Sequence, residues 1–267
     1  MDTDELDAEL DNFRVEKDDG VARLTLDSGK ANPLSEPTLN ELFEAAVTVN
    51  EDDGVRCVVL TGTDGFYCSG FDIGRLEGNK EDGAKLRRAV STYHDAVLQL
   101  HQADKPVVTG INGVAAGGGF GLALLGDVVV MSEDARLEYA YTRIGLTGDG
   151  GSTFFLPRLV GLRRATEIAL LDRPVEAKEA VEMGIATESV SADEFDDRLD
   201  EIARRLADGP TKAYAATKRL MARSFDRSLE EQLGAETEAM AEATHTEDYA
   251  RGIEAFFDDD EPEFEGR

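Results

Sequence analysis

The sequence predicts a layered α/β domain followed by a helical region. Strand, loop and helix patterns recur through residues 1–192, and glycine-rich loops follow the strands, as in domains that stack helices on a sheet. The 267 residues are enough to bury a large core. We expect an α/β core over residues 1–192, beginning with a flexible tail over residues 1–10. Residues 193–267 form a helical region that packs on this core, on a neighbouring subunit, or on both.

The first expected elements are two strands, a helix and a third strand. Residues 13–26 alternate apolar and polar side chains around a turn at Asp19 and Gly20, which predicts two strands. Ser35 is a candidate N-cap for a helix that reaches residue 52. Residues 55–62 are largely apolar and end in a glycine loop, as expected of a buried strand.

The later elements repeat this alternation. Residues 83–103 predict a helix with one apolar stripe, made by Leu86, Val90, Tyr93, Val97 and Leu100. Two further strands are expected over residues 105–113 and 127–133, and between them three glycines open an apolar helix. The helical region holds four segments, over residues 193–209, 210–225, 228–243 and 246–259.

The composition restricts the partners and the location of the protein. Asp and Glu number 56 against 28 Lys and Arg, and the net charge of −28 disfavours nucleic acid and anionic membranes. The excess of acidic residues is spread along the chain and lysine is scarce, which indicates adaptation to high salt. Salt screens the repulsion between the negatively charged side chains. No apolar run approaches the roughly 18 residues of a membrane helix. With an acidic N-terminus and only two cysteines, the sequence predicts a cytoplasmic protein.

Two glycine loops are the main candidates for chemistry. "GFYCSGFD" (65–72) and "AAGGGFG" (115–121) each place flexible backbone at the end of a strand. Two backbone N–H groups from separate loops can hold a developing negative charge, because glycine allows a ligand to approach closely. Tight packing of helix against strand is the alternative explanation of these glycines. Neither stretch matches a phosphate-binding loop.

Four ordered blocks resemble the crotonase (enoyl-CoA hydratase/isomerase) superfamily over nearly the full chain. They are "FYCSGFDI", "KPVVTGINGVAAGGGFGLALLGDVVV", "GLTGDGGSTFFLPRLVGLRRATEIALL" and "AKEAVEMGIATESV". The resemblance implies a spiral of ββα units, a helical C-terminal trimerisation region and an acyl-CoA thioester substrate. It also implies that the N–H groups of Phe71 and Gly118 form the oxyanion hole for the thioester oxygen, with Gly117 beside them in the substrate site.

The sequence departs from the hydratases of that family at both of their glutamate positions. Gly121 stands where the first glutamate is expected, and Tyr141 stands where the second is expected. One carboxylate remains nearby, Asp149 in "TGDGGS". The loop around it is similar to that of the ring-opening enoyl-CoA isomerase branch, in which this aspartate moves a proton between substrate carbons. A lone carboxylate can act as base and then as acid. The alternative is that Asp149 only forms an Asp-Gly turn.

A second branch, the 4-chlorobenzoyl-CoA dehalogenases, also resembles this chain. It has an aspartate at the Asp149 position, a phenylalanine at Phe71 and a histidine at His94, and an aromatic residue at Tyr141. There the resemblance implies that the aspartate attacks the aromatic ring and that the histidine activates water. His94 alternatively lies on the surface or between helices. His101 and His245 are expected on the surface, and no cluster of side chains suggests a metal site.

Coenzyme A carries phosphates and needs local positive charge. The richest basic segment is "TKAYAATKRLMARSFDR", which includes Lys218. The resemblance places Lys30 on the coenzyme A path, and Ser69 and Asp72 near its adenine. Ordinary surface ion pairs are the alternative role for each basic residue.

These observations predict an acyl-CoA enzyme that stabilises a thioester enolate. The expected reaction is a double-bond shift in an enoyl-CoA, in fatty acid metabolism, with Asp149 as the proton shuttle and His94 as a further candidate catalytic residue. Hydration, aryl-CoA dehalogenation and non-catalytic acyl-CoA binding are the alternatives. We expect no cofactor apart from the coenzyme A of the substrate, and a homotrimer or a dimer of trimers.

Overall fold

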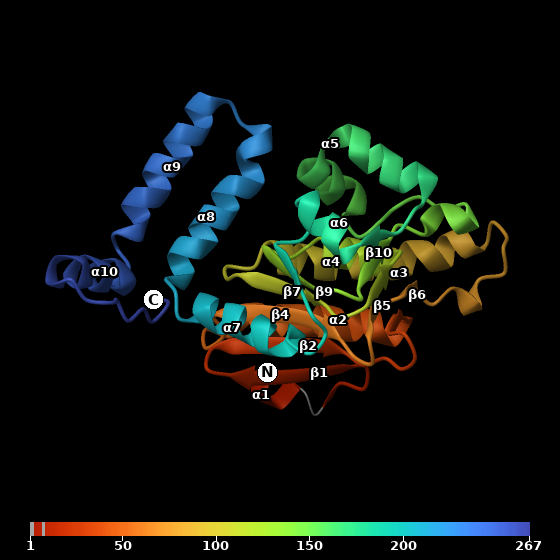
Figure 1. The fold of residues 1–267 in the computed structure, drawn as a ribbon, viewed down its shortest axis with the longest axis horizontal. Coiled ribbons are helices and arrows are strands. Elements are labelled where there is room, and N and C mark those ends of the chain that lie inside the picture. The colour runs from red at the N-terminus through yellow and green to blue at the C-terminus, as the bar shows by residue number, and fades with distance from the viewer. Residues whose placement is uncertain (1–2, 7–8) are drawn as a thin grey trace.

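A six-stranded sheet lies at the centre of the protein. The computed structural model describes residues 3–6 and 9–267 (Figure 1). In spatial order the strands are β1 (Phe13–Asp18), β2 (Val21–Leu26), β4 (Cys57–Gly62), β7 (Val107–Ile111), β9 (Val128–Ser132) and β12 (Glu188–Val190). The first two strands form the predicted antiparallel hairpin, and the others run parallel to their neighbours.

Shorter strands build two smaller sheets above the first one. One has the order β11 (Val175–Glu176), β10 (Arg136–Glu138), β8 (Val114–Ala116) and β5 (Phe66–Cys68). The other pairs β3 (Pro33–Leu34) with β6 (Gly70–Phe71). The sequence did not predict these strands as separate elements, because runs of two or three residues are too short to show a period. They carry both glycine loops.

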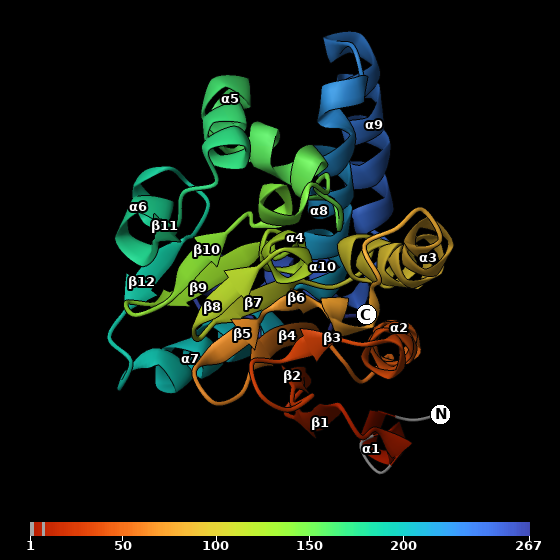
Figure 2. The ribbon, with the colours of Figure 1, turned by 90° about the vertical axis from the view of Figure 1, so that its right-hand side faces the viewer.

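Alternation along the central strands gives the large sheet two buried faces. In β4, Val58 and Leu60 belong to the main core, while Cys57 and Val59 pack with the opposite cluster. The helices α2 (Glu36–Glu51) and α3 (Asp82–His101) cover the first face, and α7 (Phe195–Ala207) covers the second (Figure 2). Ser35 caps α2 as predicted, because its hydroxyl accepts the N–H of Thr38 at 3.3 Å.

The remaining helices surround the small sheets or extend from the body. Three of them lie between strands of the spiral along the chain: α4 (Gly118–Ala123), α5 (Ser152–Leu171) and α6 (Ala177–Glu182). Gly161, with φ of +75°, interrupts the helical backbone of α5. At the C-terminal end lie α8 (Thr211–Arg223), α9 (Leu229–Ala243) and α10 (Glu247–Asp258). In Figure 1 these three helices project away from the sheet, whereas α7 lies on it.

The first residues of the chain pack more closely than the sequence predicts. Thr3–Leu6 forms the short helix α1, in which Leu6 is buried and the Thr3 hydroxyl donates to Asp52, so this part is not a solvated tail. The rest of the predicted tail includes residues 1–2 and 7–8, which lie outside the described residues. At the other end the Asp248 carboxylate accepts the N–H groups of Glu265 and Gly266. Two backbone donors therefore hold the C-terminal segment against α10.

Candidate functional site

The two glycine loops meet backbone to backbone. Gly70 in β6 has φ of +87°, and a Cβ there would lie 2.7 Å from the Ala116 carbonyl oxygen and 3.0 Å from the Gly118 nitrogen. Only glycine fits at position 70, because any side chain would collide with the second loop. Gly117 is the N-cap of α4 with φ of +53°. The predicted residues Phe71, Gly117 and Gly118 are thus brought together.

Both predicted donor N–H groups are oriented so that they can serve a ligand. The N–H of Asp72 donates to the Leu34 carbonyl at 3.1 Å, so the N–H of Phe71 points away from β3, since N–H directions alternate along a strand. Gly118 is the first residue of α4, and its N–H has no acceptor within the helix. The helix has only six residues, so its dipole adds little to the charge stabilisation that the donors provide.

Asp149 lies in the loop that precedes α5, next to two other predicted residues. The hydroxyl of Tyr141, in the short helix η3 (Tyr141–Ile144), donates to its Oδ1. Its Oδ2 has no hydrogen bond within residues 3–6 and 9–267. Burial raises the pKa of Asp149, and the Tyr141 hydroxyl and His94 oppose that increase. The carboxylate is therefore a stronger proton acceptor than an exposed aspartate, with one oxygen held and one available.

The backbone of the Asp149 loop occupies the space beside Gly121. A Cβ at position 121 would lie 2.8 Å from the Gly150 carbonyl oxygen and 3.0 Å from the Asp149 carbonyl oxygen. Position 121 therefore has no room for a glutamate while this loop keeps its conformation. A Cβ at Gly150, which has φ of +58°, would lie 2.5 Å from the ring and the hydroxyl of Tyr93. Glycines at 121 and 150 allow the carboxylate loop to approach both α4 and α3.

His94 reaches the site, as the sequence allowed. It is half-buried on α3, and its Nε2 accepts the N–H of Gly150 at 3.1 Å. In a neutral imidazole this bond places the proton on Nδ1. His94 thus helps to hold the Asp149 loop. His101 differs from the prediction of a surface residue, because it is half-buried against Phe155, with ring centroids 5.1 Å apart, and burial lowers its pKa.

Tyr93 is a residue of the site for which the sequence predicted only a packing role. Its side chain is fully buried, and its hydroxyl donates to the Gly118 carbonyl. Its ring meets the ring of Phe71 edge to face, with centroids 5.4 Å apart. The signal in the sequence that could have indicated this role is a tyrosine in an otherwise aliphatic stripe, because a buried hydroxyl needs a hydrogen-bond partner.

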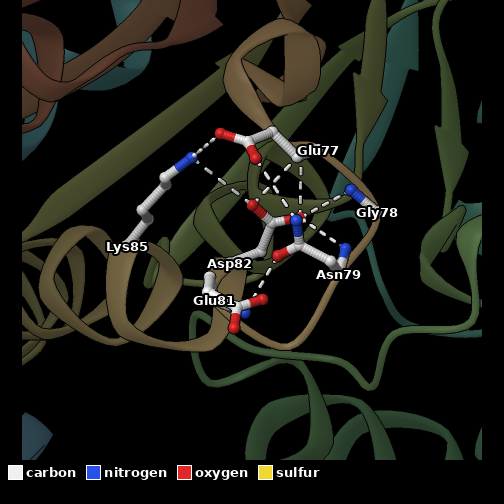
Figure 3. Close-up of polar contacts among 6 residues, drawn as sticks. All are labelled: Glu77, Gly78, Asn79, Glu81, Asp82 and Lys85. Atoms are coloured by element: carbon white, nitrogen blue, oxygen red, sulfur yellow. Dashed lines mark hydrogen bonds and ion pairs between the residues drawn. The ribbon is translucent and has the colours of Figure 1, made fainter.

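A structured loop and a cavity lie beside the site. Figure 3 shows the Asp82 carboxylate at the start of α3 accepting the N–H groups of Glu77, Gly78 and Asn79 at 2.7–3.2 Å. These backbone donors lower the pKa of Asp82, and Lys85 adds an ion pair to Glu77. The loop borders a cavity of about 460 Å³ between α2 and α3, whose lining includes Phe71, Leu76 and Leu86.

The predicted coenzyme A contacts are only partly assembled. Lys30 and Ser69 are both exposed, and their loops are joined by the bond from the Ser69 N–H to the Ala31 carbonyl, 3.0 Å. Asp72 caps the short helix η2 (Ile73–Arg75) by accepting the N–H of Gly74. Lys218 does not lie free in a basic patch, because its Nζ is 2.7 Å from Asp127 Oδ2. The alternative of a structural ion pair thus describes Lys218 in this chain.

Neither a metal cluster nor a membrane helix is found in the described part of the chain. Within residues 3–6 and 9–267, no group of three or more His, Cys, Asp or Glu side chains is arranged to hold a metal ion. Over the same residues, no helix combines the length and the apolar character needed to cross a membrane.

The chain is similar to known proteins over most of its length. Residues 16–267 match the family model described as enoyl-CoA hydratase/isomerase. A "probable enoyl-CoA hydratase" of Rhodobacter capsulatus is 36% identical, over 96% of this chain and 98% of that protein. The 1,2-epoxyphenylacetyl-CoA isomerase of Escherichia coli is 34% identical, over 95% and 97%. The 4-chlorobenzoyl coenzyme A dehalogenase-2 of an Arthrobacter species is 36% identical, over 82% and 80%.

A solved structure gives the same answer for the fold. The crystal structure of an enoyl-CoA hydratase from Bacillus anthracis superimposes with a TM-score of 0.90 at 30% identity, covering 96% of this chain and 100% of that one. The spiral of short and long strands is therefore the predicted crotonase fold. Because the family model spans nearly all of the chain and the relatives cover it at more than 30% identity, the protein belongs to the enoyl-CoA hydratase/isomerase family, the crotonase superfamily, as an acyl-CoA enzyme.

Proposed function

We propose that this enzyme is an enoyl-CoA isomerase that shifts a carbon–carbon double bond with Asp149 as its single proton carrier. The observation that carries the proposal is the closure of position 121. A Cβ there would lie 2.8 Å from the Gly150 carbonyl oxygen, so position 121 cannot supply a second carboxylate while the Asp149 loop keeps its conformation. A group that removes a proton and returns it elsewhere needs one carboxylate, whereas the family's hydratases use two.

The proposed reaction uses the parts of the site in order. The thioester oxygen accepts the N–H groups of Phe71 and Gly118, which stabilise the charge that develops on it. Asp149 takes a proton from a carbon activated by the thioester, and the electron pair of that C–H bond moves into a dienolate. The protonated Asp149 then returns the proton to the other end of the dienolate, and the thioester carbonyl re-forms. No water is consumed, and the enzyme ends in its starting state.

The environment of Asp149 supports this cycle. A raised pKa brings the acid form within reach, so the same group can release the proton in the second step. Tyr141 holds Oδ1, and Oδ2 is the oxygen proposed to take the proton. Two relatives with isomerase names add support: the 1,2-epoxyphenylacetyl-CoA isomerase above, and a trans-2-decenoyl-[acyl-carrier-protein] isomerase of Streptococcus mutans, 26% identical over 94% of this chain.

Aryl-CoA dehalogenation is the second candidate. His94 contacts the loop that carries Asp149, through the N–H of Gly150, and two 4-chlorobenzoyl coenzyme A dehalogenases are 36% identical to this chain. In that reaction His94 would need a free nitrogen to take a proton from water. Its Nε2 already accepts the Gly150 N–H, so the observed arrangement favours isomerisation.

Coenzyme A binding is proposed at the edge formed by β3 and β6. Lys30 would supply positive charge there, and backbone groups near Ser69 and Asp72 would face the adenine. Lys218 is engaged with Asp127 and is left out of this proposal.

The proposal is tested by offering 3-enoyl-CoA, 2-enoyl-CoA and 4-chlorobenzoyl-CoA in concentrated salt. We expect 3-enoyl-CoA to gain the ultraviolet absorbance of a conjugated thioester without a change of mass. Addition of one water to 2-enoyl-CoA at a faster rate would instead identify a hydratase. Chloride release would identify a dehalogenase, and binding without turnover would identify a binding protein.

Replacing Tyr141 by Phe should move the pH profile of the enzyme. The Tyr141 hydroxyl stabilises the charged form of Asp149, so its loss should raise the pKa of that carboxyl further. The base form is needed for proton removal, and the acidic limb of kcat/KM should therefore move to higher pH. The profile of the wild type, measured with the same substrate, is the reference. An acidic limb that stays in place would contradict the role given to this bond.

We also propose a homotrimer or a pair of trimers. Many large apolar side chains on α5 and on the projecting helices are exposed, and such surface favours association. They include Leu162, Leu170, Leu171, Met221, Phe225, Leu229, Met240, Phe256 and Phe257. Light scattering should give three or six times the chain mass of 29.0 kDa, and a monomer at micromolar concentration would reject this assembly.

A further inference from the structure

Tyr93 touches three parts of the proposed site. It lies on α3, and its side chain is fully buried. Its ring meets Phe71, its hydroxyl donates to the Gly118 carbonyl, and both its ring and its hydroxyl pack against the backbone of Gly150. Phe71 and Gly118 carry the two proposed donors, and Gly150 follows Asp149. A single side chain therefore contacts both donor loops and the loop of the proton carrier.

The hydrogen bond from the Tyr93 hydroxyl restrains a flexible part of the second loop. Gly118 lies within three consecutive glycines, which have no side chains to fix the peptide planes. Its helix is only six residues long and offers few bonds to hold its first turn. The Tyr93 hydroxyl holds the Gly118 carbonyl from a long, packed helix instead. Restraining the carbonyl restrains the residue, and with it the direction of its N–H.

The ring acts in the same way on the first loop. The edge-to-face contact with Phe71 has an interplanar angle of 89°, a geometry that aromatic pairs favour. Phe71 is only half-buried, so this contact with a fully buried ring helps to fix its position. Tyr93 thus restrains the distance between the two N–H donors, in addition to the direct contact of the two loops at Gly70.

We propose that Tyr93 is a positioning residue of the oxyanion hole, which acts through Gly118 and Phe71 rather than on the substrate. This inference rests on the proposed function, because it assumes that the thioester oxygen binds between the N–H groups of Phe71 and Gly118. A tyrosine whose hydroxyl is merely satisfied by the nearest carbonyl would leave the electrostatics of that site unchanged when the hydroxyl is removed.

The test is Tyr93→Phe, which removes the hydroxyl and keeps the ring. Two readouts of the site are measured with the full-length protein: the carbonyl stretching frequency of bound ¹³C-labelled butyryl-CoA, an unreactive saturated thioester, and kcat for 3-enoyl-CoA. The Kd of butyryl-CoA is measured alongside them. We expect the carbonyl band to return toward its frequency in solution, and kcat to fall by about 10-fold, less than the loss of a whole donor. The Kd of butyryl-CoA should change by less than about threefold, because binding is dominated by the rest of the ligand.

Tyr214→Phe is the control. It also removes a phenol hydroxyl, but from α8, where that hydroxyl lies against Gly209. It should leave both the band and kcat as in the wild type. A Tyr93→Phe protein with the wild-type band would overturn the inference, and so would an equal loss in both variants.

A second variant keeps the inference testable if Tyr93→Phe does not fold. Phe71→Leu loses the aromatic edge contact and retains its own N–H. The band should again relax toward the solution value, and an unchanged band would contradict the positioning role. The band needs no turnover, so a wild type that shifts the band without isomerising 3-enoyl-CoA would refute the proposed reaction alone. A wild type that isomerises while Tyr93→Phe matches it in both measurements would refute this inference alone.

Discussion

Asp149→Asn is expected to lower the turnover of 3-enoyl-CoA by about 10³-fold, within the range that general acid–base groups contribute. The substitution retains the size of the side chain and an oxygen that can accept the Tyr141 hydroxyl. It removes the carboxylate that is proposed to carry the proton. Binding of a saturated acyl-CoA should persist, because the two N–H donors and the cavity are untouched. Steady-state rates and the Kd of butyryl-CoA measure the two effects separately.

The same substitution should not destabilise the protein. Burial raises the pKa of Asp149 above its value in an unfolded chain, so the folded state holds this proton more tightly. Stability from such a group is complete below the unfolded pKa and is lost as the pH rises through the folded pKa. Ionisation of Asp149 therefore costs stability, and asparagine, which carries no charge, avoids that cost. Thermal unfolding at pH 7 should give an equal or higher Tm.

Asp95→Asn is the matched control for this prediction. Asp95 is exposed on α3, one residue after His94, and its replacement changes the charge by the same amount. We expect its rate to equal that of the wild type. Undiminished turnover by Asp149→Asn would refute the proton-carrier role, and a large loss in Asp95→Asn would show that net charge, rather than Asp149, controls the rate.

Long periodic segments made much of the fold predictable. The β1–β2 hairpin, the Ser35 cap and the four helices after residue 193 were each expected from local pattern and are present. The short strands were not, because β6 and β8 are defined by their neighbours in space. The buried Leu6 and the C-terminal segment held by Asp248 likewise depend on contacts across the fold.

In the site, too, the sequence predicted individual residues but not the contacts between residues that are distant in sequence. The resemblance to the crotonase superfamily selected Phe71, Gly118 and Asp149 as candidate site residues. It could not show that Tyr141 donates to Asp149, nor that Tyr93 donates to Gly118, since 25 residues separate the second pair. Lys218 illustrates the opposite error. The sequence shows a basic segment that could bind phosphate, but in the fold the Lys218 ammonium group lies 2.7 Å from Asp127 Oδ2 and is paired with it.

Gly121→Ala is expected to lower kcat by about 10- to 100-fold. A methyl group there would lie 2.8 Å from the Gly150 carbonyl oxygen and 3.0 Å from that of Asp149, so backbone must move. A displacement of the order of 1 Å at a reacting group can cost about 100-fold in rate. Overpacking of this kind costs about 1–3 kcal/mol of stability, which exceeds the roughly 1 kcal/mol that alanine gains over glycine in a helix. Rates and urea unfolding measure both.

Gly83→Ala is the control, because this helical glycine lies near the start of α3 and no neighbouring atom comes within 4 Å of the place that its new methyl group would take. It should leave the rate unchanged and stabilise the helix slightly. If Gly121→Ala matched Gly83→Ala in rate and stability, the Asp149 loop would be able to move aside at little cost. The contacts at position 121 would then not exclude a second carboxylate there.

Gly121→Glu tests the choice between hydration and isomerisation. It restores the residue type that the family's hydratases have at this position, yet we expect no hydration of 2-enoyl-CoA. The glutamate would need the space that the Gly150 carbonyl now fills, and making that space displaces Asp149. A carboxylate at 121 and the observed placement of Asp149 therefore exclude each other. Addition of water to 2-enoyl-CoA by this variant would show that both carboxylates fit, and would contradict the proposal of a single proton carrier.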